Sequence, residues 1–185
     1  MTKFIGLAGK MGSGKSTFAD IMVNNGLAHE QMALATGVKK FAKDIFDKGD
    51  RDIWQWMGNT MRQYDSGVWI NYLKRQLRWS YITGDPNFIV VVSDIRYRNE
   101  AEWIINQGPL IFIDTQDGRR RVRIENRNKE IIAHDRWLKQ QQHPSETELD
   151  YIKELSNVYI FDNNDYLSYD DLANKFIKWY QETVK

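Results

Sequence analysis

The sequence predicts an α/β fold in which helices cover both faces of a parallel sheet. Three features lead to this expectation: a glycine-rich loop between a strand and a helix, several nearly continuous apolar runs, and helical patterns between those runs. Apolar runs without alternation are typical of strands that are buried on both faces, as in a parallel sheet. Their alternation with helices is typical of doubly wound proteins.

Five strands are expected in this sheet. Four have strong apolar signals and lie at residues 4–8, 88–93, 110–114 and 157–161. A weaker candidate at residues 31–35 would be the second strand in chain order. Helical patterns lie at residues 99–106, 146–155 and 168–183, and the last of them places Leu172, Phe176, Ile177 and Tyr180 on one face.

Composition limits the class of protein. A chain of 185 residues is long enough for one domain with a sizeable core. The absence of cysteine excludes disulfides, thiolate metal sites and cysteine nucleophiles, and it fits a reducing cytoplasm. No apolar run approaches the roughly 20 residues that span a bilayer, and no signal-peptide pattern precedes the first strand. We therefore expect a soluble intracellular protein, and a net charge of +1 gives it no overall attraction to nucleic acid.

The glycine-rich loop is the strongest functional signal. Residues 9–16 read GKMGSGKS and match the phosphate-binding pattern G-x-x-x-x-G-K-[ST]. In this pattern the lysine, Lys15, reaches the outer phosphates of ATP or GTP, and the hydroxyl of Ser16 binds Mg²⁺. The residues expected to contact the nucleotide are Lys10, Gly12, Ser13, Gly14, Lys15, Ser16 and Thr17. The alternative is a glycine-rich turn without a ligand.

Two segments exceed what a minimal alternation of strands and helices needs. Residues 38–83 contain Trp54, Trp56, Trp69 and Trp79 along two or three predicted helices, and we expect them to cradle a second substrate. Residues 116–142 are rich in arginine and are expected to form a mobile lid. One domain, residues 1–185, with these two insertions is the simplest organisation.

Asp94 and Arg96 follow the strongest predicted strand, and ligands bind at the carboxyl ends of the strands in open α/β sheets. Phosphoryl transfer needs cations and acids positioned around phosphates and Mg²⁺, and we expect Asp94 to face the phosphates. The alternative is structural: Asp94 caps the helix that begins near Tyr97, and Arg96 pairs with Glu100 on the surface. The two interpretations are compatible.

Arg62 and Trp69 are candidates for contact with a second substrate. A planar guanidinium suits a phosphate, and an indole face suits a nucleobase. Tryptophans at helical spacing are more often core residues, however, and Trp54 and Trp79 are assigned to the core.

The predicted lid carries five arginines in residues 118–127, namely Arg119, Arg120, Arg121, Arg123 and Arg127. Charge alone is equally typical of a solvated helix face, a nucleic-acid patch and a lid that closes over phosphates. The context favours the lid, because an arginine brought in by closure stabilises the charge in transfer and excludes water. His134 and His143 have no partners at a convincing metal-ligand spacing.

Together these elements resemble the deoxynucleoside monophosphate kinases of bacteriophages, a branch of the P-loop nucleoside monophosphate kinases. The most specific matches are D-[IV]-R-[FY]-x-N-E-[AG] at residues 94–101 and His-Pro-Ser-Glu at residues 143–146. Further matches lie at residues 9–17, 41–43, 55–62, 69–70 and 163–164, so the resemblance covers most of the chain. It implies a three-layer P-loop kinase fold and the transfer of the terminal phosphate of ATP, with Mg²⁺, to a deoxynucleoside 5′-monophosphate.

The resemblance also implies roles for single residues. Lys15 would hold ATP, Ser16 and Asp94 would form the metal site, and Glu146 would anchor the return of the lid. The acceptor would contact Lys43, Arg62, Trp69, Asp94 and Arg96. Arg119 would close over ATP, and the catalytic residues would be Lys15, Asp94, Arg96, Arg120 and Arg123. The expected partners are therefore ATP and the monophosphate, without nucleic acid or membrane; a homodimer is possible, in the cytoplasm of an infected host.

Two other interpretations remain open. One is a different small-molecule P-loop kinase, similar to dephospho-coenzyme A kinase or animal-type phosphomevalonate kinase, although residues 58–62 with Trp69 favour a nucleotide acceptor. The other is a nucleotide-dependent binding protein or NTPase whose arginines contact a nucleic-acid backbone, against which the near-neutral charge argues.

Overall fold

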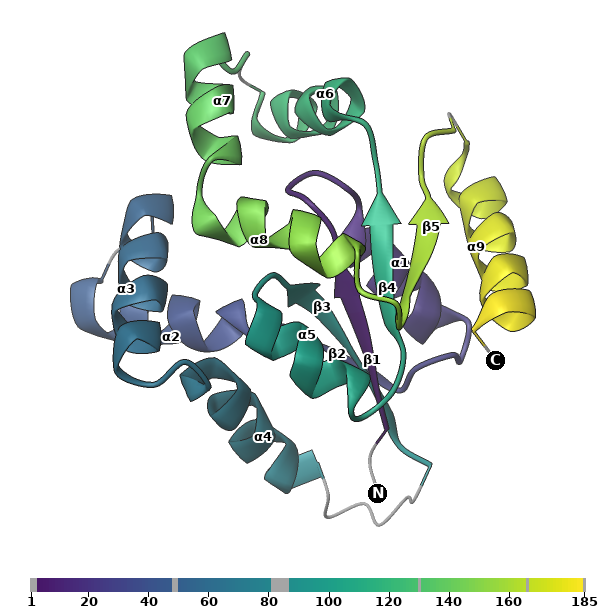
Figure 1. Cartoon of the computed structure of the whole chain (residues 1–185), viewed down its shortest axis with the longest axis horizontal. Helices are drawn as coiled ribbons and strands as arrows, with labels where there is room; N and C mark the ends of the chain where they lie inside the picture. The colour runs from purple at the N-terminus through teal and green to yellow at the C-terminus, as the bar shows by residue number, and fades with distance from the viewer. Residues whose placement is uncertain (1–2, 48–49, 81–86, 130, 166, 185) are drawn as a thin grey trace.

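The protein contains a parallel five-stranded sheet, as the sequence predicts. The computed structural model describes residues 3–47, 50–80, 87–129, 131–165 and 167–184. The strands are β1 (Lys3–Ala8), β2 (Glu30–Met32), β3 (Ile89–Ile95), β4 (Leu110–Asp114) and β5 (Val158–Asp162), in the spatial order β2-β3-β1-β4-β5 (Figure 1). The weakly predicted strand is thus confirmed as β2, which pairs with β3 at the edge of the sheet.

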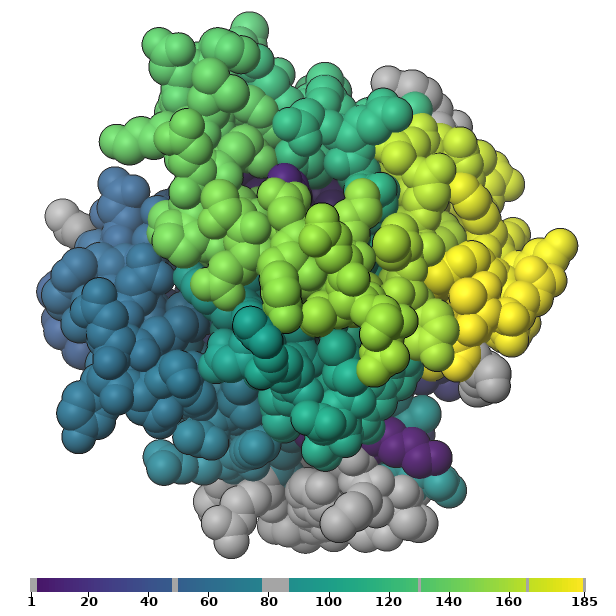
Figure 2. Space-filling view, in the orientation of Figure 1, coloured from purple at the N-terminus to yellow at the C-terminus, as the bar shows by residue number. Residues whose placement is uncertain are grey.

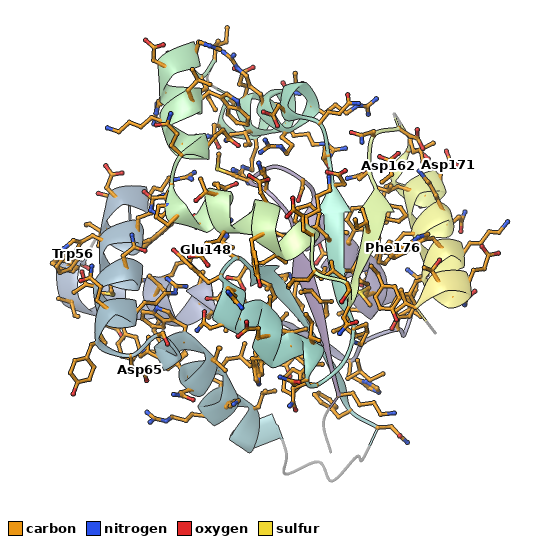
Figure 3. All side chains as sticks on the ribbon, viewed as in Figure 1. Trp56, Asp65, Glu148, Asp162, Asp171 and Phe176 are labelled. Carbon is orange, nitrogen blue, oxygen red and sulfur yellow. The ribbon has the colours of Figure 1, made fainter. Side chains whose placement is uncertain are left out.

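Helices cover both faces of the sheet and complete three layers. Helices α1 (Lys15–Asn24) and α9 (Tyr169–Thr183) lie on one face, and α5 (Arg98–Ile105) and α8 (Pro144–Lys153) lie on the other (Figure 1). On the α1 and α9 face, the rings of Phe18, Phe161 and Phe176 meet with centroids 4.8 to 5.2 Å apart. Figure 3 shows Phe176 pointing from α9 toward the sheet.

The opposite face has its own core, which extends into the first insertion. There Ala101, Ile104, Leu149 and Ile152 of α5 and α8 are fully buried against β4 and β1. Three helices follow β2 and join this core: α2 (Ala35–Phe46), α3 (Arg51–Tyr64) and α4 (Val68–Ser80). The insertion is therefore packed on the sheet through apolar side chains.

Trp69 belongs to this core, so the expectation that it lies beside a base is wrong. Its side chain is 2% exposed, and its Nε1 donates a hydrogen bond to the carbonyl of Gly58 at 3.3 Å. Trp54 is partly buried against the same core, as expected, whereas the side chain of Trp79 lies outside the described residues. Trp56 is 58% exposed and points away from the sheet (Figure 3).

The arginine-rich segment forms α6 (Asp117–Asn128) and α7 (His134–Gln141), above the carboxyl end of the sheet (Figure 1). Ile124, Ile132 and Trp137 from this segment are buried together with Met11 of the glycine-rich loop. Both helices are therefore packed onto that loop, and the extent to which they move stays a prediction. None of the described helices is both long and apolar enough to cross a membrane.

A substitution tests the assignment of Trp69 to the core. Trp69→Phe leaves a small cavity and removes the donor to Gly58, so the free energy of unfolding should fall by about 1 to 3 kcal/mol. Trp56→Phe, at an exposed position of α3, should change it by less than about 0.5 kcal/mol. Urea denaturation measures both values. Equal stability of the two variants, with nucleotide binding lost in Trp69→Phe, would restore the role beside a base.

Candidate functional site

The glycine-rich loop connects β1 to α1 at the centre of the sheet. Gly9, Gly12 and Gly14 have φ values of 142°, 83° and 99°. At Gly12 an added Cβ would lie only 2.7 Å from the carbonyl oxygen of Arg120, so a larger residue would collide with α6 as well as strain the backbone. The loop is therefore tightly wound through left-handed glycines, a form whose remaining backbone N–H groups suit an anion.

Residues after two neighbouring strands hold this loop in place. The carbonyl of Ser13 accepts hydrogen bonds from Asn163 Nδ2 at 2.9 Å, Thr115 Oγ1 at 3.2 Å and Arg123 Nη1 at 3.3 Å. Asn163 follows β5, Thr115 follows β4, and Arg123 comes from α6. The loop is thus fixed by three separate segments, which favours a preorganised binding site.

The amino group of Lys15 is buried. Its side chain is folded back so that Nζ donates to the carbonyls of Gly9 and Lys10, the latter at 3.1 Å. Burial, followed by repulsion from Arg96, lowers the pKa of Lys15 from 10.5 to about 7. Among the described residues Lys15 forms no ion pair, so its charge is available to an incoming anion.

Glu146 connects the loop to Arg96. This carboxylate is fully buried. One oxygen accepts a hydrogen bond from the backbone N–H of Met11 at 2.8 Å, and the other accepts a hydrogen bond from Arg96 Nη1. The expected surface pair of Arg96 with Glu100 is therefore wrong. The side chain of Arg96 is instead joined to the phosphate-binding loop through Glu146, and its contact with a phosphate stays a prediction. Glu146 lies in the first turn of α8, the helix that follows the arginine-rich segment. His143 caps this helix by accepting a hydrogen bond from the backbone N–H of Ser145.

Asp94 caps a helix other than the expected one. Its two carboxylate oxygens accept the backbone N–H groups of Leu34 at 2.7 Å and Ala35 at 2.8 Å, at the start of α2 rather than α5. Each oxygen keeps a second lone pair. Ser16 is exposed in the first turn of α1. These hard oxygen groups fit Mg²⁺, which takes one or two protein ligands beside phosphate oxygens and retains several waters.

Arg62 is held within a network between α3 and α5. Its Nη2 lies 3.0 Å from Glu100 Oε1, and its guanidinium stacks 4.1 Å from the centre of the Tyr97 ring. The other Glu100 oxygen accepts the backbone N–H groups of Arg96 and Tyr97 at 2.9 and 3.1 Å. Burial raises the pKa of the Glu100 carboxyl, an effect that the nearby Arg62 opposes. The hydroxyl of Tyr97 donates to Asn59 Oδ1 at 3.2 Å.

Arg120 has a structural position, so its assignment as a catalytic residue is wrong. Its side chain is buried and donates to the carbonyl of Met11 at 3.0 Å, to Asp117 and to Gln141 at 3.0 Å. Its guanidinium also lies 5.3 Å from the centre of the Trp137 ring. A residue so occupied cannot turn toward a ligand without unpacking α6.

The other predicted contact residues differ in position. Arg123, as its bond to Ser13 shows, lies beside the loop, and Arg119 is partly buried one turn earlier in α6. Lys10 instead directs its Nζ to Asp150 of α8 at 2.7 Å, while its carbonyl accepts hydrogen bonds from Lys15 Nζ and the N–H of Ser13 within the loop. Lys43 is exposed near the end of α2, about 12 Å along the helix from its start beside Asp94, so the structure does not bring it to the site.

A pocket of about 240 Å³ opens beside the loop, between β4 and α8. Figure 2 shows a hollow between α8 and the helices α6 and α7, with atoms of the N-terminal part of the chain at its floor. The charged residues that line the pocket include two ion pairs, Lys10 with Asp150 and Lys153 with Asp114, each at 2.7 Å. These charges neutralise one another.

Arg51, the first residue of α3, belongs to none of the sequence motifs but lies at the site. Its Nη1 lies 2.8 Å from the Met11 sulfur in the phosphate-binding loop, and it forms no ion pair with any carboxylate of the described residues. Burial lowers the pKa of Arg51, and repulsion from Arg96 adds to this effect. The signal that could have found it is the helical spacing of the polar residues at positions 51, 55, 59 and 62.

The Glu146 bridge predicts a large difference between two acids of α8. Glu146→Gln leaves Arg96 without its partner, so the free energy of unfolding should fall by about 2 kcal/mol. Glu148→Gln is the matched control, because Glu148 lies two residues away and is partly exposed, where it accepts the N–H of Arg98 (Figure 3). Urea denaturation should give a change below about 1 kcal/mol for it. Equal losses would contradict the bridge.

Comparisons with known proteins agree with this geometry. The AAA domain family matches residues 5–142. A protein of Acanthamoeba polyphaga mimivirus, named as a predicted deoxynucleotide monophosphate kinase, is 28% identical over 186 aligned positions that cover 84% of this chain and 86% of that protein.

Solved structures resemble the whole chain. Shikimate kinase from Acinetobacter baumannii, in complex with shikimate, superposes with a TM-score of 0.60 at 15% identity and covers 100% of this chain and 97% of its own. Dephospho-CoA kinase from Campylobacter jejuni gives a TM-score of 0.51 at 17% identity, with 98% and 97% covered. The chain therefore belongs to the AAA domain family and has the fold of the P-loop kinases.

Proposed function

We propose that the protein transfers the terminal phosphate of ATP, with Mg²⁺, to deoxynucleoside 5′-monophosphates. The observation that carries this proposal is the bridge through Glu146. One carboxylate binds both the phosphate-binding loop, at Met11, and Arg96 at the end of β3. Groups suited to a donor phosphate and to an acceptor phosphate are therefore held at a fixed separation, which is the main requirement of phosphoryl transfer.

The donor half of the site consists of the loop and its supports. The backbone N–H groups and Lys15 would hold the ATP phosphates, and Ser16 with Asp94 would hold Mg²⁺, the latter through water. When bound, Mg²⁺ would neutralise phosphate charge during transfer. Arg119 and Arg123 of α6 would approach ATP, which the bond of Arg123 to Ser13 of the loop supports, whereas Arg120 would only support the loop.

The acceptor half lies between Arg96 and α3. Polar side chains of α3 contact Tyr97, through Asn59, and the phosphate-binding loop, through Arg51. The name of the mimivirus relative supports a deoxynucleotide as the acceptor. Structural neighbours named for shikimate and dephospho-CoA support a second candidate, a small-molecule kinase with another acceptor.

An acceptor panel separates these candidates. Formation of ADP from ATP and Mg²⁺ would be followed with dAMP, dCMP, dGMP, dTMP, their ribose counterparts, shikimate, gluconate and dephospho-CoA, and without an acceptor. We expect ADP to depend on a deoxynucleoside monophosphate. Lys15→Met, which removes a charge that stabilises the transferred phosphoryl group, should lower kcat by about 10²-fold or more. Acceptor-independent ADP, or turnover only with a non-nucleotide, would contradict the proposal.

The lowered pKa of Lys15 predicts a proton linkage. With a pKa of about 7, most Lys15 side chains in the free protein are neutral at pH 8, whereas a bound phosphate favours the ammonium form. ATP binding at pH 8 should therefore take up a proton, and the affinity should fall as the pH rises above 7. Calorimetry in Tris and in HEPES measures the uptake from the difference in heat.

Lys15→Arg provides the control for this linkage, because a guanidinium stays protonated at pH 8. Its uncorrected binding heats in Tris and in HEPES should therefore be equal, which means that no proton is taken up. Equal heats for the wild-type protein in both buffers would mean that Lys15 is already charged before ATP binds, which would contradict the prediction.

A further inference from the structure

One face of α3 carries a polar stripe along the site. Arg51, Gln55, Asn59 and Arg62 are spaced by four, four and three residues, so they share one face of the helix. All four are partly buried, whereas Asp52, Trp56, Thr60 and Gln63 on another face are exposed. The stripe therefore lies on the side of α3 that is turned toward the interior of the protein. The Cα atoms of Arg51 and Arg62 are about 16 Å apart along the helix axis.

The Arg62 end of the stripe is electrically balanced. Arg62 pairs with Glu100, which is 1% exposed and also accepts the N–H groups that begin α5. A phosphate that took over Arg62 would leave this buried carboxylate without its cation, which is costly. The ring of Tyr97 and the amide of Asn59 complete this end, and both are groups that contact uncharged surfaces and hydrogen-bonding edges.

The Arg51 end is unbalanced. Arg51 contacts the thioether of Met11, which is a weak acceptor for a guanidinium with five donors. The same charged groups, Arg96 and Glu146, act on both Arg51 and Lys15, so the two cations lie in one electrostatic neighbourhood. There Glu146 is already shared by Arg96 and the N–H of Met11. The excess positive charge fits a phosphate dianion, and a guanidinium binds its oxygens in a bidentate manner.

We propose that Arg51, together with Arg96, binds the phosphate of the acceptor nucleotide, and that Arg62, Tyr97 and Asn59 form the end of the cleft that receives its base. This inference rests on the proposed function and orients its substrate along α3. It replaces Arg62 by Arg51 as the phosphate-binding residue of the first insertion. The acceptor phosphate then lies beside Lys15 and the donor, and the base lies further along α3, toward Asn59 and Tyr97.

The test measures binding directly, so that it does not depend on turnover. Calorimetry would record the affinity of the full chain, saturated with a non-hydrolysable ATP analogue and Mg²⁺, for a dNMP and for deoxyribose 5-phosphate, which has no base. Arg51→Gln should weaken binding of both ligands by about 10- to 100-fold, the effect of losing a charge-assisted contact. Arg51→Lys should recover part of the loss, because it restores charge but not the planar fork.

Arg62→Gln is the matched variant at the other end of the stripe. It should leave the affinity for deoxyribose 5-phosphate within about threefold of the wild-type value while changing the relative affinities for different dNMPs. Its thermal unfolding is measured alongside, because the substitution breaks the pair with Glu100. Arg51→Gln breaks no ion pair with a described residue and should unfold as the wild type does.

Two further outcomes separate the assignment from the function on which it rests. If the wild type binds dNMPs but Arg51→Gln binds them equally well, and Arg62→Gln loses deoxyribose 5-phosphate, the phosphate lies at Arg62 and only the assignment is overturned. If the wild type binds no dNMP while it binds the ATP analogue, the proposed acceptor is wrong and the assignment fails with it.

Discussion

The arrangement of this site depends on one buried carboxylate, that of Glu146. An isolated charge in the interior is costly, and here the cost is offset by the backbone N–H of Met11 and the guanidinium of Arg96. Those two partners belong to the phosphate-binding loop and to the end of β3, while Glu146 itself lies on α8, at the return from the arginine-rich segment. A single residue thus fixes the distance between three parts of the fold.

The remaining charges follow a simple division. Each buried or partly buried carboxylate at the site is already used within the protein: Asp94 caps α2, Glu100 holds Arg62 and the start of α5, and Glu146 forms the bridge. Two cations, Lys15 and Arg51, form no ion pair with a described residue. The carboxylates at the site are therefore all engaged in contacts within the protein. The excess positive charge beside the glycine-rich loop suits phosphate groups.

Sequence predicted the sheet, its strands and the loop because these depend on local patterns of apolar residues and glycines. It failed where the same pattern serves two purposes. Trp69 has the helical spacing of both a core residue and a ligand contact, and only the fold shows that it is buried. Arg120 is one of five neighbouring arginines, and its position on α6 relative to Met11 and Trp137 decides that it is structural. Arg51 belongs to no motif; its proximity to the loop arises from the packing of α3.

The central claim is that donor and acceptor phosphates meet between the loop and α3. A bisubstrate analogue, in which adenosine and a deoxynucleoside are joined through a pentaphosphate, tests this claim most directly by calorimetric titration. Because one ligand would fill both halves of the site, we expect a one-to-one complex that is at least 10²-fold tighter than the complex with ATP alone. Binding of a dNMP should be lost when the analogue is present. An affinity equal to that of ATP, with dNMP binding unchanged, would contradict the account.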